Sequence, residues 1–120
     1  MTAQDTLARR FAEGNDPRSI ASASNVTAET TPADGYDAVI VGYGHAVYAA
    51  RRTDGSIVLF EGWRDRSQST RCQLTKLASG FRAGGRGDFD RTDDGQPGRG
   101  TFPGFDPRDA DDADADEVAA

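Results

Sequence analysis

Three reactive residue types are almost absent from this sequence of 120 residues, because lysine, cysteine and histidine each occur once, as Lys76, Cys72 and His45. One cysteine excludes an internal disulfide and any site with several cysteine ligands. One histidine excludes a multi-histidine metal site within one chain. A lone thiol is usually a small buried group in a reducing compartment, and we expect this of Cys72. The sequence therefore predicts no metal site.

Long apolar runs are also lacking. A membrane-spanning helix needs about 20 mainly apolar residues, and no stretch of the chain approaches that length. The first turns contain charged residues such as Arg9 and Arg10 around Leu7 and Phe11, without the apolar core of a signal peptide. We expect a cytoplasmic protein that does not contact a membrane.

Catalytic and cofactor patterns are equally scarce. A Cys72–His45 nucleophilic pair can be drawn, but the sequence offers no third group that would orient the histidine. The Gly42-Tyr43-Gly44 segment is not a dinucleotide fingerprint, because no third glycine opens a helix after it. The sequence therefore predicts a protein that is not an enzyme and needs no cofactor.

Charge is abundant and strongly biased. The chain has 14 basic and 20 acidic residues, a net charge of -6, and 13 of the basic residues are arginine while 16 of the acidic ones are aspartate. Such an aspartate-rich, lysine-poor composition is typical of proteins that work in molar salt, where an acidic surface stays hydrated. The charge is uneven: residues 1–35 carry -2, residues 36–82 carry +3 and residues 83–120 carry -7.

The composition divides the chain into three parts. Residues 1–35 are expected to form a short helix, with Thr2 as its cap and Gly14 as its stop, followed by a flexible linker rich in Ser, Thr and Ala. Residues 36–82 are expected to form the compact core. Residues 83–120 are rich in Gly and Asp and are expected to be a disordered acidic tail, since they have too few apolar residues to offset chain entropy.

The core pattern predicts an α+β unit, a three-stranded antiparallel meander followed by one amphipathic helix. The β-rich runs are residues 36–42, 45–52 and 56–62, and Asp54-Gly55 between the last two is a hairpin signal. Leucine spacing predicts a helix over residues 70–79. Thr70 and Gln73 match a capping box, and Gly80 is the expected stop.

Alternation along the strands makes both faces of the predicted sheet apolar, which is unusual for a sheet with one face in water. One face would carry Val39, Ala49 and Leu59, and the other Ile40, Tyr48 and Val58. One helix can cover one face, so we expect either docking of the N-terminal helix or a homodimer.

Basic and hydroxyl side chains cluster just before and at the start of the predicted core helix. A helix N-terminus offers unpaired N–H groups and the positive end of the dipole, so such side chains there could hold a phosphate. This predicts a non-enzymatic module that binds nucleic acid or another polyanion. In the alternative, the arginines pair with the chain's own acids and the protein is a structural or interaction protein, of viral or plasmid origin, that acts as a homodimer. The candidate anion-binding residues are Arg64, Arg66, Ser67, Ser69, Thr70 and Arg71.

Four elements of residues 41–77 carry a resemblance: GYGHAVYA, a DG hairpin, a GW dipeptide and a Ser/Thr-rich helix start. This pattern resembles a group of small proteins from the chromosomes, plasmids and viruses of haloarchaea. The resemblance implies a salt-loving source and the limits of the core, and it implies no activity. Related sequences carry a histidine within the last helix, where this chain has Cys72, Gln73 or Thr75, which weakens any histidine-based mechanism further.

Overall fold

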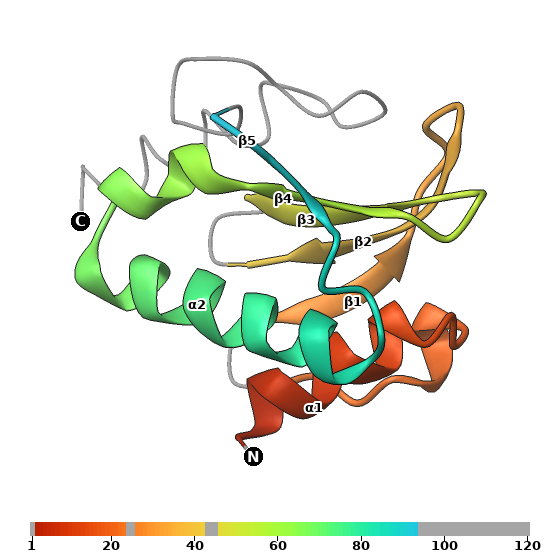
Figure 1. Cartoon of the computed structure of the whole chain (residues 1–120), viewed down its shortest axis with the longest axis horizontal. Helices are drawn as coiled ribbons and strands as arrows, with labels where there is room; N and C mark the ends of the chain where they lie inside the picture. Colours follow the sequence, from red (N-terminus) through yellow and green to blue (C-terminus); the bar gives the residue numbers. More distant parts are fainter. Residues whose placement is uncertain (1, 24–25, 43–45, 94–120) are drawn as a thin grey trace.

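Five strands form one mixed sheet in the computed structural model, which describes residues 2–23, 26–42 and 46–93 (Figure 1). The strands lie in chain order across the sheet, antiparallel from β1 to β4, with β5 parallel to β4. Together with two helices they confirm the α+β class. The strands are β1 (Thr27–Thr30), β2 (Tyr36–Val41), β3 (Val47–Arg52), β4 (Ile57–Phe60) and β5 (Asp90–Thr92).

The expected three-stranded sheet is wrong in its strand number, since β1 and β5 extend the meander at both sides. β1 follows a short 3₁₀ helix, η1 (Pro17–Ser19), so both elements lie in the segment expected to be a linker. β5 lies in the segment expected to be disordered and is held in place by Phe89, a buried residue whose ring packs edge-on against Phe81 with centroids 5.5 Å apart. Both strands are too short to show a period, and each forms because a longer neighbour offers an open edge.

The two sheet faces also differ from the expected ones. Ile40 pairs with Ala49, and Ala49 pairs with Leu59, so these three side chains share one face. Val39 therefore lies on the opposite face, and the predicted grouping had exchanged it with Ile40. A one-residue shift reverses every side chain of a strand, and a strand that is apolar on both faces gives no signal that fixes its register.

The N-terminal helix, α1 (Ala3–Ala12), begins as the sequence predicts. Thr2 and Asp5 form a reciprocal capping box: the Thr2 hydroxyl accepts from the Asp5 N–H at 3.2 Å, and the Thr2 N–H donates to Asp5 Oδ2 at 3.0 Å. This arrangement satisfies two of the N–H groups that a helix start leaves without partners.

The core helix, α2 (Gln68–Ala83), is longer than predicted at both ends. Its N-cap is Ser67, whose hydroxyl accepts from the Thr70 N–H at 3.1 Å, so the proposed Thr70–Gln73 capping box is wrong. The expected stop at Gly80 is wrong as well, because α2 runs through Gly80 and ends at Ala83, with Gly84 as its C-cap. The third predicted strand is shortened, since residues 61–65 fold into a 3₁₀ helix, η3 (Glu61–Asp65), that leads toward α2.

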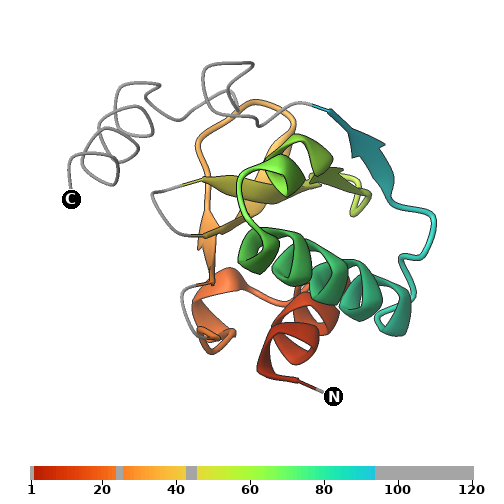
Figure 2. The ribbon, with the colours of Figure 1, turned by 90° about the vertical axis from the view of Figure 1, so that its left-hand side faces the viewer.

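The N-terminal arm docks beside α2, and both helices lie on the same side of the sheet (Figures 1 and 2). The arm is therefore docked, but it does not cover the second face of the sheet as the sequence analysis expected. The contact is made by small residues at matching four-residue spacing. A Cβ added to Gly80 would overlap Ala8, and one added to Gly84 would lie 2.8 Å from the Cβ of Ala12. Phe11 and Phe81 pack beside this contact with ring centroids 6.0 Å apart. Glycine at these positions lets the two helix backbones come close.

A buried arginine ties α1 to the sheet. Arg51 of β3 is 4% exposed, and its guanidinium donates to the backbone carbonyls of Phe11 at 2.8 Å and Asn15 at 3.0 Å. It also donates to Asp37 at 2.8 Å. The last carbonyls of a helix lack partners and form the negative end of its dipole, so a cation there stabilises the docked arm.

Candidate anion-binding surface

Arg64 lies in η3 and is largely engaged within the protein. Its guanidinium forms an ion pair with Glu61, and its Nη1 donates to Thr75 Oγ1 at 3.1 Å and to the carbonyl of Arg71 at 3.4 Å. These contacts fasten η3 to the first turns of α2. Arg64 therefore positions the start of the helix more than it offers a free charge.

The hydroxyl groups at the helix start are divided between capping and solvent. Ser67 and Thr70 are bonded to each other, with 3.0 Å between Oγ and Oγ1, in addition to the capping bond. Thr70 is 6% exposed, so its side chain faces the core. Ser69 is exposed. Of the three hydroxyls predicted to contact an anion, only that of Ser69 points to water without a capping role.

The remaining two predicted arginines lie on opposite sides of Ser67 in the chain. The guanidinium carbon of Arg66 lies 5.5 Å from the centroid of Trp63, whose indole N–H donates to the carbonyl of Val47 at 3.0 Å. Arg71 is exposed on the first turns of α2. The six predicted residues are thus neighbours at one junction, but they do not converge as ligands around one point.

A broader basic surface follows the whole of α2. The helix contains no aspartate or glutamate, and its three cations, Arg71, Lys76 and Arg82, lie outside the buried stripe of Leu74, Leu77 and Phe81. Exposed hydroxyls accompany them at Ser69, Thr75 and Ser79. We call this solvent-facing side of α2, defined by Arg71, Lys76 and Arg82, the basic face.

The basic face extends beyond the cluster predicted from the sequence, which lies at the helix start and shares only Arg71 with it. The signal in the sequence is an absence: α2 has 16 residues without a carboxylate, in a chain that has 20 acidic residues. Periodicity places the three cations on one side of the helix, which makes the same stretch positive as a surface. The charge that distinguishes this helix is therefore visible only when sequence and helix geometry are combined.

Aromatic stacking extends the basic face toward β5. The ring of Phe89 is flanked by two guanidinium groups, that of Arg82 with its carbon 5.8 Å and that of Arg91 with its carbon 4.8 Å from the ring centroid. Arg91 also pairs with Glu61 at 2.7 Å. Glu61 thus accepts from both Arg91 and Arg64, so one carboxylate stands among several cations at this side of the molecule.

A second, more balanced set of charges surrounds the hairpin turn. Arg52 pairs with Asp90 at 2.8 Å, and this hydrogen bond raises the pKa of Arg52. The Ser56 hydroxyl and N–H donate to Asp54 at 2.6 and 2.9 Å, and these bonds lower the pKa of the Asp54 carboxyl. Gly55 has a φ of 91°, which fits its predicted role in the turn. Acids and bases here satisfy each other, whereas no ion pair of Arg71, Lys76 or Arg82 is found among the described residues.

Cys72 does not behave as expected, because the side chain is exposed on α2 and the predicted burial is wrong. Within residues 2–23, 26–42 and 46–93, no group of three His, Cys, Asp or Glu residues could hold a metal ion. The same described residues include no helix long and apolar enough to cross a membrane. His45 and the Cys72–His45 pair lie outside the described residues.

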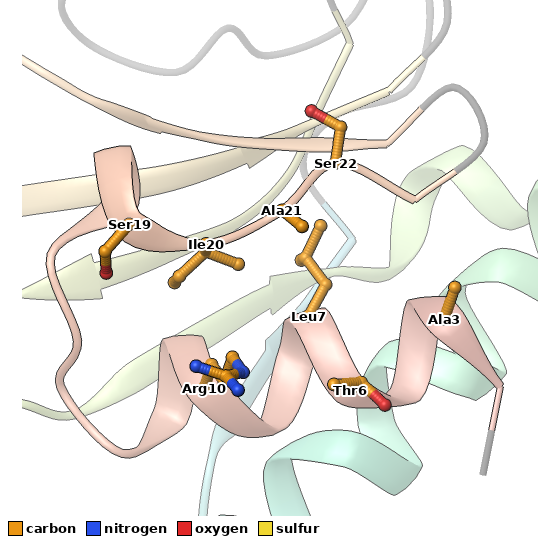
Figure 3. Close-up of a pocket in the computed structure, with 8 residues that line it drawn as sticks. All are labelled: Ala3, Thr6, Leu7, Arg10, Ser19, Ile20, Ala21 and Ser22. Atoms are coloured by element: carbon orange, nitrogen blue, oxygen red, sulfur yellow. The ribbon is translucent and has the colours of Figure 1, made fainter.

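A groove of about 390 Å³ runs between α1 and the segment after η1 (Figure 3). Leu7 and Ile20 form its apolar part, and Arg10 is its one charged lining residue. With a single cation the groove is a poor match for a polyanion. Its other lining residues are small or hydroxylated, namely Ala3, Thr6, Ser19, Ala21 and Ser22.

Comparisons with protein-family models, with curated proteins and with solved structures found no match to this chain. The function is therefore argued from the fold and from the surface of α2.

Proposed function

We propose that this protein is a non-enzymatic binding module that holds a nucleic acid, or a similar polyanion, against the basic face. The observation that carries the proposal is the acid-free α2, which exposes cations and hydroxyls in a chain with a net charge of -6. The stacked pair of Arg82 and Arg91 extends the positive surface beyond the helix. This modifies the first hypothesis, because the binding surface is a helix side instead of a phosphate pocket at a helix start.

The dimensions of α2 suit a repeating anion. A helix of 16 residues is about 24 Å long, and duplex DNA carries one phosphate charge per about 1.7 Å of its axis. Arginine and lysine contacts to phosphates release counterions, so the binding constant falls as salt rises. Serine and threonine hydroxyls can add hydrogen bonds to phosphate oxygens without reading the base sequence. We expect binding that depends on salt and little on sequence.

The test is titration of a short DNA duplex of mixed sequence over about 50 to 200 mM salt. Arg71→Gln/Lys76→Gln removes two charges of the basic face, and Arg10→Gln/Arg18→Gln removes two charges from α1 and η1 as the matched control. The plot of log K against log salt should become shallower by about 1.8 in the first variant, since each phosphate contact contributes about 0.9. Equal losses in both variants, or no binding by the unmodified chain, would refute the proposal.

A second proposal is self-association along β1, as a structural or interaction protein that forms a homodimer. The supporting observation is that β1 is an outer strand, paired with β2 on one side, among the residues described. Outer strands offer backbone groups for pairing, but exposed charges such as Glu29 weigh against it at low salt. Molar salt would screen that repulsion. A monomer by light scattering at both low and high salt would exclude it.

A further inference from the structure

All of the net negative charge of the chain lies in residues 94–120. Residues 1–93 have 12 basic and 12 acidic residues, whereas residues 94–120 have two arginines and eight acids. Six of those acids fall within residues 109–117. We call residues 109–117 the acidic run. Residues 1–93 therefore have no net charge, and most of the acids that follow them are concentrated in the acidic run.

The described part of the chain ends after β5, a strand that starts at the Phe89 ring beside Arg82 of the basic face. Thr92 is in register with Phe60, the residue that precedes η3, and Arg91 reaches Glu61 of η3 at 2.7 Å. Arg91 and Arg82 of α2 flank the same Phe89 ring. The last described residue, Asp93, is therefore two positions beyond an arginine that borders the basic face.

Chain length allows the acidic run to reach all of α2. The run begins 16 residues after Asp93, and that much chain can span up to about 53 Å at 3.3 Å per residue. The helix itself is about 24 Å long. Because the run is tethered to the surface it complements, its local concentration there does not depend on the protein concentration.

From charge complementarity, the exit point and this reach, we propose that the acidic run docks on the basic face and competes there with the polyanion. The competition rests on the proposed function, whereas the docking does not. The carboxylates of the run would occupy the positions of phosphates against Arg71, Lys76 and Arg82. The protein would then bind strongly only to a ligand whose charge density exceeds that of its own acidic run, and weak anions would be rejected.

Cys72 provides a direct probe of the docking, because it is the chain's single cysteine and is exposed on α2 next to Arg71. A nitroxide attached to Cys72 of the full chain broadens the NMR signals of amides that come close to it. At low salt we expect loss of the signals of residues 109–117, and recovery when salt is raised or the nitroxide is reduced. Unbroadened signals at low salt would overturn the docking.

Two controls identify the surface. Arg71→Gln/Lys76→Gln should restore the signals of the acidic run, and Arg10→Gln/Arg18→Gln should leave them broadened. Equal broadening in both variants would overturn the assignment to the basic face. Addition of the DNA duplex to the unmodified labelled chain should restore the signals by displacement. If the duplex binds and the broadening persists, competition is refuted. If the duplex does not bind, the proposed function fails while the nitroxide result still decides the docking.

Discussion

The two sides of α2 have opposite compositions. The inner side includes Leu74, Leu77, Phe81 and Gly80, all buried, and it meets α1 at a distance that leaves no room for a Cβ on Gly80. The outer side is hydroxylic and basic and includes no carboxylate. The inner side of α2 therefore contributes close packing against α1, and the outer side contributes positive charge at the surface.

The difference separates what the fold requires from what binding would require. On the inner side, the size of each side chain is constrained, because adding atoms to a packed interior or removing them lowers stability. Exposed substitutions usually change stability by less than about 0.5 kcal/mol. If this distinction is correct, substitutions on the side of α2 that packs on α1 lower the free energy of unfolding, and substitutions on the basic face change binding alone.

The largest effect on stability should come from Arg51→Met. The change removes the donor to the carbonyl of Asn15 and one of two donors to the carbonyl of Phe11, which keeps the Gly14 N–H at 3.2 Å. A buried acceptor left without a partner costs about 1–3 kcal/mol. Because Asp37 is partly exposed and water can reach it, we expect a total loss of about 2–4 kcal/mol. Urea unfolding followed by circular dichroism measures this loss.

The neighbouring arginine supplies the control. Arg52 is a partly exposed member of the same strand and pairs with Asp90 at 2.8 Å. Pairs in such positions contribute about 0–1 kcal/mol, so Arg52→Met should cost less than Arg51→Met. Similar losses of stability for both variants would show that the burial of Arg51 does not determine how much it stabilises the fold. The distinction between buried and exposed positions would then weaken.

The next largest effect should come from Gly80→Ala. Helix propensity alone predicts a gain of about 1 kcal/mol, since alanine is the better helix former. The added Cβ, however, would overlap Ala8 and the carbonyl of Asp5, and overpacking of this kind costs about 1–3 kcal/mol. We expect net destabilisation in thermal unfolding. Ser79→Ala, at the exposed neighbouring position, should be neutral or stabilising, and a stabilised Gly80→Ala would show that α1 is not closely packed.

Sequence reasoning predicted the elements whose signals are local. The Thr2 cap of α1, the turn at Gly55 and the buried leucines of α2 each depend on neighbours within a few residues. It missed β1 and β5, whose pairing depends on edges supplied by distant residues. Gly80 was misread for the same reason, because a glycine that ends a helix and a glycine that admits a second helix look alike in one sequence.

The candidate site shows the same limit. Sequence alone located a cluster of arginines and hydroxyls at the helix start, but contacts decide which of them are available. Arg64 forms an ion pair with Glu61, and the hydroxyls of Ser67 and Thr70 are hydrogen-bonded to each other. Lys76 and Arg82 lay outside the predicted cluster and became candidates when the helix placed them beside Arg71. Partner choice within the protein cannot be derived from spacing, because it depends on which long side chains the fold brings together.

The smallest effect concerns the outer charges of the hairpin turn. Bonds from Ser56, first its hydroxyl and then its N–H, lower the pKa of Asp54, with help from Arg52 and Arg86. A carboxyl whose pKa is lower in the folded state stabilises the fold above its unfolded pKa of about 3.9, and this stabilisation is lost as pH falls through the folded value. Asp54→Asn should therefore be less stable than the unmodified chain at neutral pH, and the two should converge in acid. Urea unfolding at both pH values measures the difference, with Asp34→Asn as an exposed control. A difference that persists in acid would mean that Asp54 acts through the shape of the turn, and not through its charge.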